Sequence, residues 1–191
     1  MLDTALKEWA IVCDLLLSGE LKLLLRKGGI HESGGPGVFE LEHPRFLLYP
    51  SYVHQKPEMI KPDYRGRVAV LDEEPGEVTF AGLGEAGKVW RVPSREAFDT
   101  LDDLHCWSPA QIDMRFTYKP DRPLYLLAVR AYRLATTHTV KNHEEYSGCR
   151  SWVALRPGDA VEDAGAEPVI ADEPFAGLID LIDRAFSPVH G

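Results

Sequence analysis

The 191-residue sequence lacks the features that assign a chain to a membrane or a secretory pathway. No apolar run approaches the roughly 20 residues that a membrane-spanning helix needs. The N-terminus has no cationic start followed by a small-residue cleavage site, and Asp3 and Glu8 come early, so no signal peptide is expected. The sequence therefore predicts a protein that does not associate with a membrane.

Cysteine is also scarce. The three cysteines, Cys13, Cys106 and Cys149, are odd in number, far apart and without a Cys-x-x-Cys pair. Disulfide frameworks and zinc sites need paired cysteines at short or regular spacings. We therefore expect reduced, buried thiols and a cytoplasmic location.

Basic charge is too sparse for a broad nucleic-acid-binding surface. The net charge is −9, and eight anions but only one cation follow residue 156, so most of this charge belongs to the C-terminal tail. Residues 20–67 carry eight cations against six anions. This mild local excess permits an anionic ligand, but it falls short of the basic stripe that tight, non-specific nucleic-acid binding requires.

The sequence does contain enough apolar residues, 45% in all, to form a hydrophobic core. Apolar periodicity and turn residues predict an alternation of helices and strands. The expected helices cover residues 4–18, 94–104, 109–116 and 175–186, and the expected strands cover 21–25, 38–41, 46–49, 67–71, 77–80, 88–92, 124–134 and 151–155. This mixture predicts an α+β fold of one domain, with helices packed on a mixed or curved sheet.

Several boundaries rest on particular residues. Gly19 is placed to end the first helix in a left-handed conformation, although a hairpin over residues 11–25 is an alternative. Ser94 and Ser108 precede helical patterns as N-caps, and Asp172 is expected to cap the last helix. Glycines at positions 82, 84 and 87 suggest a hairpin turn between strands 77–80 and 88–92. Residues 157–191, an acidic loop and a helix, are expected to be an appendage to the same core.

Residues 26–55 hold the densest set of reactive side chains in the sequence. Arg26 and Lys27 come before Gly28 and Gly29, where a strand is expected to end in a loop. Glycines let a backbone approach a phosphate or carboxylate, and neighbouring cations neutralise it. Neither GxxxxGK[ST] nor a GxGxxG that opens a helix occurs here, so the pattern is also that of a simple turn at a strand end.

Two carboxylates stand close to this loop. Glu40 and Glu42 alternate on one expected strand, so their side chains would leave the same face. With Lys27 or His43 near them, they would bind Mg²⁺ or divide acid and base roles. A solvated strand face with ordinary charges is the alternative.

Two histidines and their neighbours suggest a ligand pocket. If strands 38–41 and 46–49 pair, His43 and His54 lie near one end of the sheet, although structural histidines bonded to backbone carbonyls are the favoured interpretation. The expected ligand-binding set is Arg26, Lys27, Tyr52, His54 and Gln55. A second cluster, residues 145–152, contains Cys149 and Trp152, and a tight turn with both buried is favoured over a nucleophilic thiol.

Several blocks resemble a known family along nearly the whole chain. They include residues 5–10, 23–30, 130–134 and 145–152, together with Phe39, Glu42, His43, Phe46, Pro50, Tyr52, His54 and Gln55. These blocks resemble the family of bacterial and archaeal proteins called domain of unknown function 1802, with Ser51 at a position where threonine is expected. The resemblance brings no established reaction. Because some members accompany restriction-type nuclease domains, it implies a role in nucleic-acid defence or repair.

Three hypotheses follow from these observations. The first is a module that binds a nucleic acid, a nucleotide or another ligand through residues 26–55. The second is a metal-dependent phosphodiesterase in which Glu40 and Glu42 hold the metal, Glu8 on the first helix completes the metal site, and Lys27 and His43 or His54 assist catalysis. The third is an accessory interaction domain that works through its acidic tail. The residues do not decide between binding and catalysis.

Overall fold

The computed structural model describes residues 1–27, 43–148 and 151–187 of the chain. Within these residues, seven strands and five α-helices form one α+β domain, which confirms the predicted fold class. The strands are β1 (Thr4–Trp9), β2 (Leu23–Arg26), β3 (Arg45–Ser51), β4 (Glu77–Arg91), β5 (Tyr125–Lys141), β6 (Trp152–Ala154) and β7 (Glu167–Pro168). The helices are α1 (Ala10–Ser18), α2 (Pro62–Arg65), α3 (Arg95–Asp99), α4 (Pro109–Thr117) and α5 (Asp172–Phe186).

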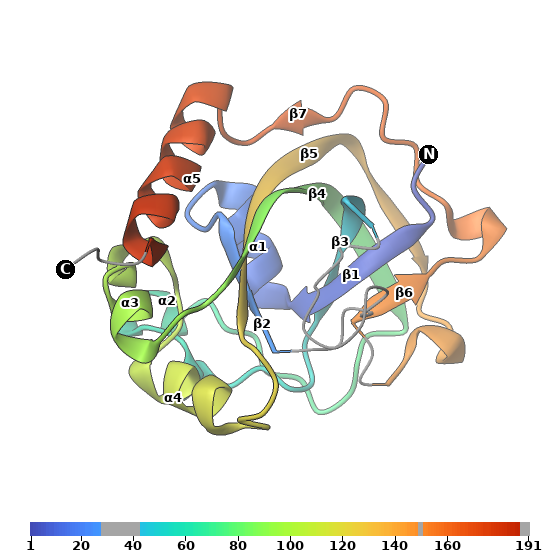
Figure 1. Cartoon of the computed structure of the whole chain (residues 1–191). Helices are drawn as coiled ribbons and strands as arrows, with labels where there is room; N and C mark the ends of the chain where they lie inside the picture. The colour runs from blue at the N-terminus through green and yellow to red at the C-terminus, as the bar shows by residue number, and fades with distance from the viewer. Residues whose placement is uncertain (28–42, 149–150, 188–191) are drawn as a thin grey trace.

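The strands form one mixed sheet in the order β2-β5-β4-β3-β1-β6, with β7 added to β5. Only the pairing of β1 with β3 is parallel among these strands. The long strands β4 and β5 arch over β1, β3 and α1, and α2 to α5 gather on one side of the molecule (Figure 1). The sheet is therefore strongly curved without being closed, as the sequence suggested.

The first predicted helix was wrong in its first half. Thr4–Trp9 is a strand that lies between β3 and β6, and only Ala10–Ser18 is helical. Pairing on both edges overrides the helical spacing of the apolar residues, because sheet contacts outweigh weak local propensity. The end of the helix is as predicted, since Gly19 has φ 81° and its N–H donates to the carbonyl of Leu16.

The predicted hairpin between residues 77–80 and 88–92 was also wrong. The segment is one continuous strand, β4, which pairs with β5 along its length. The register shifts between Phe80 and Gly82 and between Ala86 and Lys88, and such irregularities increase bending and twist. The glycines of β4 thus stand where a bent strand meets close neighbours rather than in a turn.

The short helices follow their capping residues. Ser94 Oγ accepts a hydrogen bond from the N–H of Ala97, and Ser108 Oγ accepts one from the N–H of Gln111. The helix predicted over 94–104 is divided into α3 and a 3₁₀ turn at Asp102–Leu104. Asp172 does not act as an N-cap, because it already lies within α5, whose N-cap is Ala171. The strand predicted over residues 67–71 was wrong, because these residues form no strand in the structure.

Two clusters of buried apolar side chains form the core. The larger cluster packs α1, β2 and β5 against α5 through residues such as Leu16, Leu24 and Ile182. The smaller cluster surrounds Tyr49 and Phe80 on the other side of the sheet. No helix among the described residues is both long and apolar enough to cross a membrane.

One titratable side chain is enclosed in the larger core. His105 has no exposed side-chain surface, and its ring stacks on Phe98 with centroids 5.0 Å apart and lies 5.4 Å from the ring of Trp107. Neither ring nitrogen has a hydrogen-bond partner within the described residues. Burial therefore lowers the pKa of His105 to about 4.

This histidine predicts sensitivity to acid. Because the unfolded chain binds a proton near pH 6.5 and the folded chain only near pH 4, the stabilising effect of the neutral ring is present above pH 6.5 and is lost as the pH falls towards 4. We expect a loss of about 3 kcal/mol across that window. Urea unfolding at several pH values would measure it. His105→Phe, which keeps the stacked ring, should flatten this dependence, and an unchanged pH profile in that variant would contradict the assignment.

Candidate functional site

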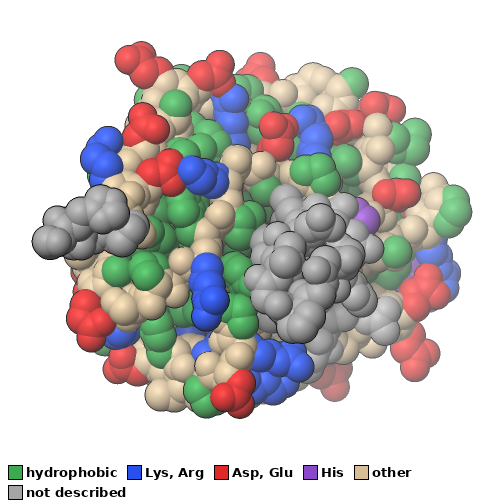
Figure 2. All heavy atoms as spheres, viewed as in Figure 1, with side chains coloured by type: hydrophobic (Ala, Val, Ile, Leu, Met, Phe, Trp, Pro, Cys, Tyr) green, Lys and Arg blue, Asp and Glu red, His purple; other side chains and the backbone are tan. Residues whose placement is uncertain are grey.

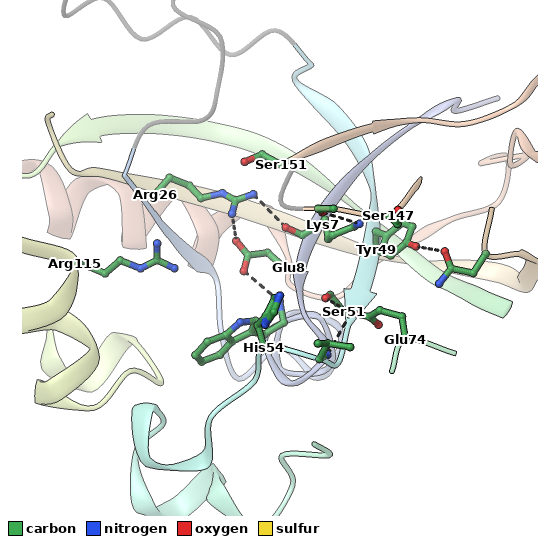
Figure 3. Close-up of a pocket in the computed structure, with 14 residues that line it drawn as sticks. Lys7, Glu8, Arg26, Tyr49, Ser51, His54, Glu74, Arg115, Ser147 and Ser151 are labelled. Carbon is green, nitrogen blue, oxygen red and sulfur yellow. Dashed lines mark hydrogen bonds and ion pairs between the residues drawn. The ribbon is translucent and has the colours of Figure 1, made fainter. Parts of the chain in front are cut away.

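A cavity of about 570 Å³ opens where the parallel strands β1 and β3 end. Carboxyl ends of parallel strands are a frequent place for ligand sites in open sheets, because side chains from neighbouring strands converge there. Here β1 contributes Lys7, Glu8 and Trp9, and the end of β3 contributes Ser51 and the residues after it. The end of β2, helix α4 and the approach to β6 complete the walls (Figure 3).

One ion pair in the lining of this pocket joins two strands that are not neighbours in the sheet. Arg26 on β2 lies 2.7 Å from the carboxylate of Glu8 on β1, and it also donates to the carbonyl oxygen of Lys7 at 3.3 Å. The two side chains are only 11% and 12% exposed. Since β5, β4 and β3 separate β2 from β1 in the sheet, this ion pair bridges the open side of the curved sheet.

Lys7 is held by backbone oxygens. Its Nζ donates to the carbonyls of Tyr146 and Gly148 and lies 4.8 Å from the centroid of the Tyr49 ring. Tyr146 is itself fully buried, and its hydroxyl donates to Asp159 at 2.5 Å. The cation of Lys7 therefore fastens the turn before β6 to β1 and shapes the wall that this turn contributes.

Two further polar groups of the wall are also satisfied. Tyr49 donates its hydroxyl proton to Asn142 at 2.7 Å, and burial raises the pKa of Tyr49 to about 12. The carboxylate of Glu74 accepts hydrogen bonds from Ser51 Oγ at 2.5 Å and from the backbone N–H groups of Tyr52 and Val53. These bonds satisfy and orient both groups within the site.

Arg115 on α4 differs from the other cations. It lines the same cavity, and its guanidinium points towards Glu8 (Figure 3). Within the described residues it makes no hydrogen bond or ion pair, and its Nε is buried without a partner. Burial is the main effect on this group and lowers the pKa of Arg115, while the charge of Glu8 partly opposes that effect.

Of the predicted ligand-binding residues, Arg26 and His54 line the cavity. His54 is exposed at its edge. Lys27 lies outside the lining and donates to the carbonyl of Phe116 at 2.9 Å, in the last turn of α4. Partial burial lowers the pKa of Lys27. A cation at a helix C-terminus is favourable, so Lys27 supports the helix that carries Arg115.

The other predicted residues lie beside the cavity. Gln55 is buried, accepts from the N–H of Ile11 at 2.8 Å and donates to the carbonyl of Ala69, so it caps the start of α1. Tyr52 lines a neighbouring cavity of about 310 Å³ that shares Glu74 and Asn142 with the first. The ring of His43 lies edge-on to Trp152 with centroids 5.1 Å apart.

The predicted metal site falls outside the described residues. Glu40 and Glu42, as well as Cys149 of the second cluster, belong to segments that the structure does not describe. Among the residues that are described, no group of three or more His, Cys, Asp or Glu side chains is arranged to hold a metal ion. The Mg²⁺ site and the phosphodiesterase hypothesis built on it stay predictions.

The structure brings the two clusters of the sequence together. Arg26, Ser51 and His54 line the same cavity as Ser147 and Ser151. Sequence analysis placed Glu8 on a helix and did not identify Lys7, Glu74 or Arg115. None of these stands in a motif, and only the fold brings them to the pocket from three separate segments.

The curved α+β sheet with a polar cavity at its parallel strand ends defines a domain with a ligand-sized pocket. A model of the family named domain of unknown function, DUF1802, matches residues 5–180, and the chain belongs to that family. No curated protein matches this sequence.

Solved structures with a similar fold include the ASCH protein from Zymomonas mobilis. Its crystal structure shares 10% identity over 82% of this chain and 89% of that chain, with a TM-score of 0.46. Crystal structures of two point mutants of the same protein are similar at a TM-score of 0.47. They share 9% and 10% identity over 83% and 82% of this chain and 94% and 91% of theirs.

Proposed function

We propose that this protein binds a nucleic acid or a nucleotide through a phosphate group in the cavity at the ends of β1 and β3. The observation that supports this most strongly is Arg115, a largely buried guanidinium with no hydrogen-bond or ion-pair partner in the described residues. Burying a charge without a partner is costly, and an anionic ligand would supply the partner. A guanidinium fits phosphate well, because its planar donors reach two oxygens at once.

The surroundings of Arg115 agree with such a ligand. The ion pair of Arg26 and Glu8 forms one wall, and the exposed ring of His54 stands at the edge. The half-buried indole of Trp9 also lines the cavity and offers an aromatic face on which a base can stack. The volume lies within the roughly 300–1,000 Å³ typical of small-ligand sites.

Substitution of Arg115 tests this proposal. We expect Arg115→Gln to weaken binding of a fluorescently labelled single-stranded oligonucleotide by about tenfold or more, because a charge-assisted hydrogen bond contributes roughly 1.5–3 kcal/mol. Fluorescence anisotropy at low salt would measure the dissociation constants.

Arg184→Gln is the matched control. Arg184 is exposed on α5 and makes no hydrogen bond or ion pair with a described residue, so its substitution removes the same charge away from the cavity. If both variants lose affinity equally, the effect is one of net charge, and the pocket assignment is wrong. Undiminished affinity in Arg115→Gln would contradict the proposal directly.

A further inference from the structure

We infer that the cavity takes one internal phosphodiester of a single-stranded nucleic acid, and not the polyphosphate of a free nucleotide. This inference rests on the proposed function and specifies its ligand. It begins with the charges of the described lining residues. Lys7, Arg26 and Arg115 are cations, and Glu8 and Glu74 are anions, so these five side chains together carry one excess positive charge.

Arg115 is the cation of the described lining that has no hydrogen-bond or ion-pair partner there. Lys7 Nζ is bonded to two backbone carbonyls, and Arg26 is paired with Glu8. The carboxylate of Glu74 keeps its charge and accepts hydrogen bonds from a hydroxyl and from backbone N–H groups. The cavity therefore offers one guanidinium to a ligand, together with the hydroxyl of Ser151 and the ring of His54, for which no described residue provides a hydrogen bond.

One guanidinium matches one monoanion. An internal phosphodiester carries a single negative charge, whereas polyphosphates carry several and are bound in proteins by glycine-rich backbone cradles, additional cations and metal ions. Among the described lining residues, Arg115 has near it the carboxylate of Glu8 and the paired Arg26, and no further unpaired cation. A polyphosphate here would place like charges beside Glu8 and Glu74, and that repulsion would cost affinity.

The surface favours a single strand over a duplex. On the described part of the face shown in Figure 2, acidic and basic side chains are interspersed, and neither sign forms a continuous stripe. Duplex binding relies on many phosphate contacts along a basic stripe. A cavity with one free cation and an indole on its wall instead fits one nucleotide unit of a strand whose bases are unpaired.

Competition measurements test the inference. In these measurements the protein is first bound to a labelled DNA or RNA hexanucleotide that has hydroxyl groups at both ends. A dinucleoside monophosphate, AMP or ATP is then added as the competitor. We expect the dinucleoside monophosphate to compete at least about tenfold better than ATP, and we expect this preference to disappear in Arg115→Gln. Parallel DNA and RNA hexanucleotides would distinguish which sugar is preferred. If ATP is the better competitor, the inference fails while the proposed function stands, and if no nucleic acid or nucleotide binds, both fail.

The salt dependence gives an independent readout. For one phosphate contact to a single strand, the slope of log K against log salt is expected to be about −0.7, and Arg115→Gln should bring it towards zero. Arg115→Lys keeps the charge without the planar fork, so it should keep the slope and lose affinity. A slope that corresponds to three or more contacts and persists in Arg115→Gln would overturn the inference.

Discussion

Replacement of Gly82 by alanine is expected to lower the free energy of unfolding by about 3 kcal/mol. A Cβ atom at this position would lie 2.3 Å from Cδ2 of Leu17 and 2.4 Å from the carbonyl oxygen of Tyr132. The leucine can change rotamer, but the carbonyl belongs to β5, which is hydrogen-bonded to β4 on one side and β7 on the other. The backbone must therefore separate, and the ladder on at least one side must weaken.

Thermal and urea unfolding would measure this effect. For a chain of this length, a loss of 3 kcal/mol corresponds to a fall in Tm of about 6–12 °C. Gly76→Ala is the matched control, because Gly76 immediately precedes β4 and a Cβ there meets nothing within 4 Å. We expect the control to change stability by no more than about 0.5 kcal/mol. Equal stability of the two variants would mean that the close approach at Gly82 is not a constraint.

The same glycines show why part of the fold was not predictable from the sequence. Three glycines in six residues are typical of a turn, and the sequence alone favours a hairpin. In the structure, Gly84 instead lies against Phe46 and Val129, and Gly87 lies against Phe175 of α5. A single sequence does not show whether a glycine is present to allow a turn or to allow close packing. Only the positions of the neighbouring elements in the structure distinguish these two roles.

Most local signals were reliable where the physical cause is local, although the cap predicted at Asp172 was wrong. The caps at Ser94 and Ser108 depend on a hydroxyl and an N–H three residues away, and both were predicted. Gly19 likewise ends α1 through its own backbone conformation. Thr4–Trp9 was misassigned because its conformation depends on β3 and β6, which are distant in sequence.

The candidate site follows the same rule. The sequence indicates that residues 26–55 and 145–152 are unusual, and their described parts do meet in one cavity. It gives no indication that, among the described residues lining the cavity, Arg115 is the cation without a partner, because this depends on the bonds that Lys7 and Arg26 make. Which charge is available to a ligand is a property of the whole arrangement and not of any motif.

The second large effect is expected from the ion pair between Glu8 and Arg26. Removal of one partner from an almost fully buried pair leaves an uncompensated charge, so Glu8→Gln and Arg26→Met should each cost about 3 kcal/mol. The double variant should cost less than the sum of the two, with a coupling of about 1–3 kcal/mol in a double-mutant cycle. The exposed pair of Glu145 and Arg156 serves as the control cycle, and its coupling should stay below about 1 kcal/mol.

This cycle also connects the stability of the sheet with the choice of ligand. If the pair holds β2 to β1 across the open side of the sheet, both single variants should unfold at lower urea concentrations than the unchanged protein. Strictly additive changes in the free energy of unfolding across the cycle would contradict that role.

Glu8→Gln has a further consequence, because it removes a carboxylate from the cavity and leaves Arg26 free beside Arg115. The excess charge of the described lining then rises from one to two. We therefore expect AMP, with its doubly charged phosphate, to gain affinity relative to a dinucleoside monophosphate in this variant, whereas Arg26→Met should show no such gain.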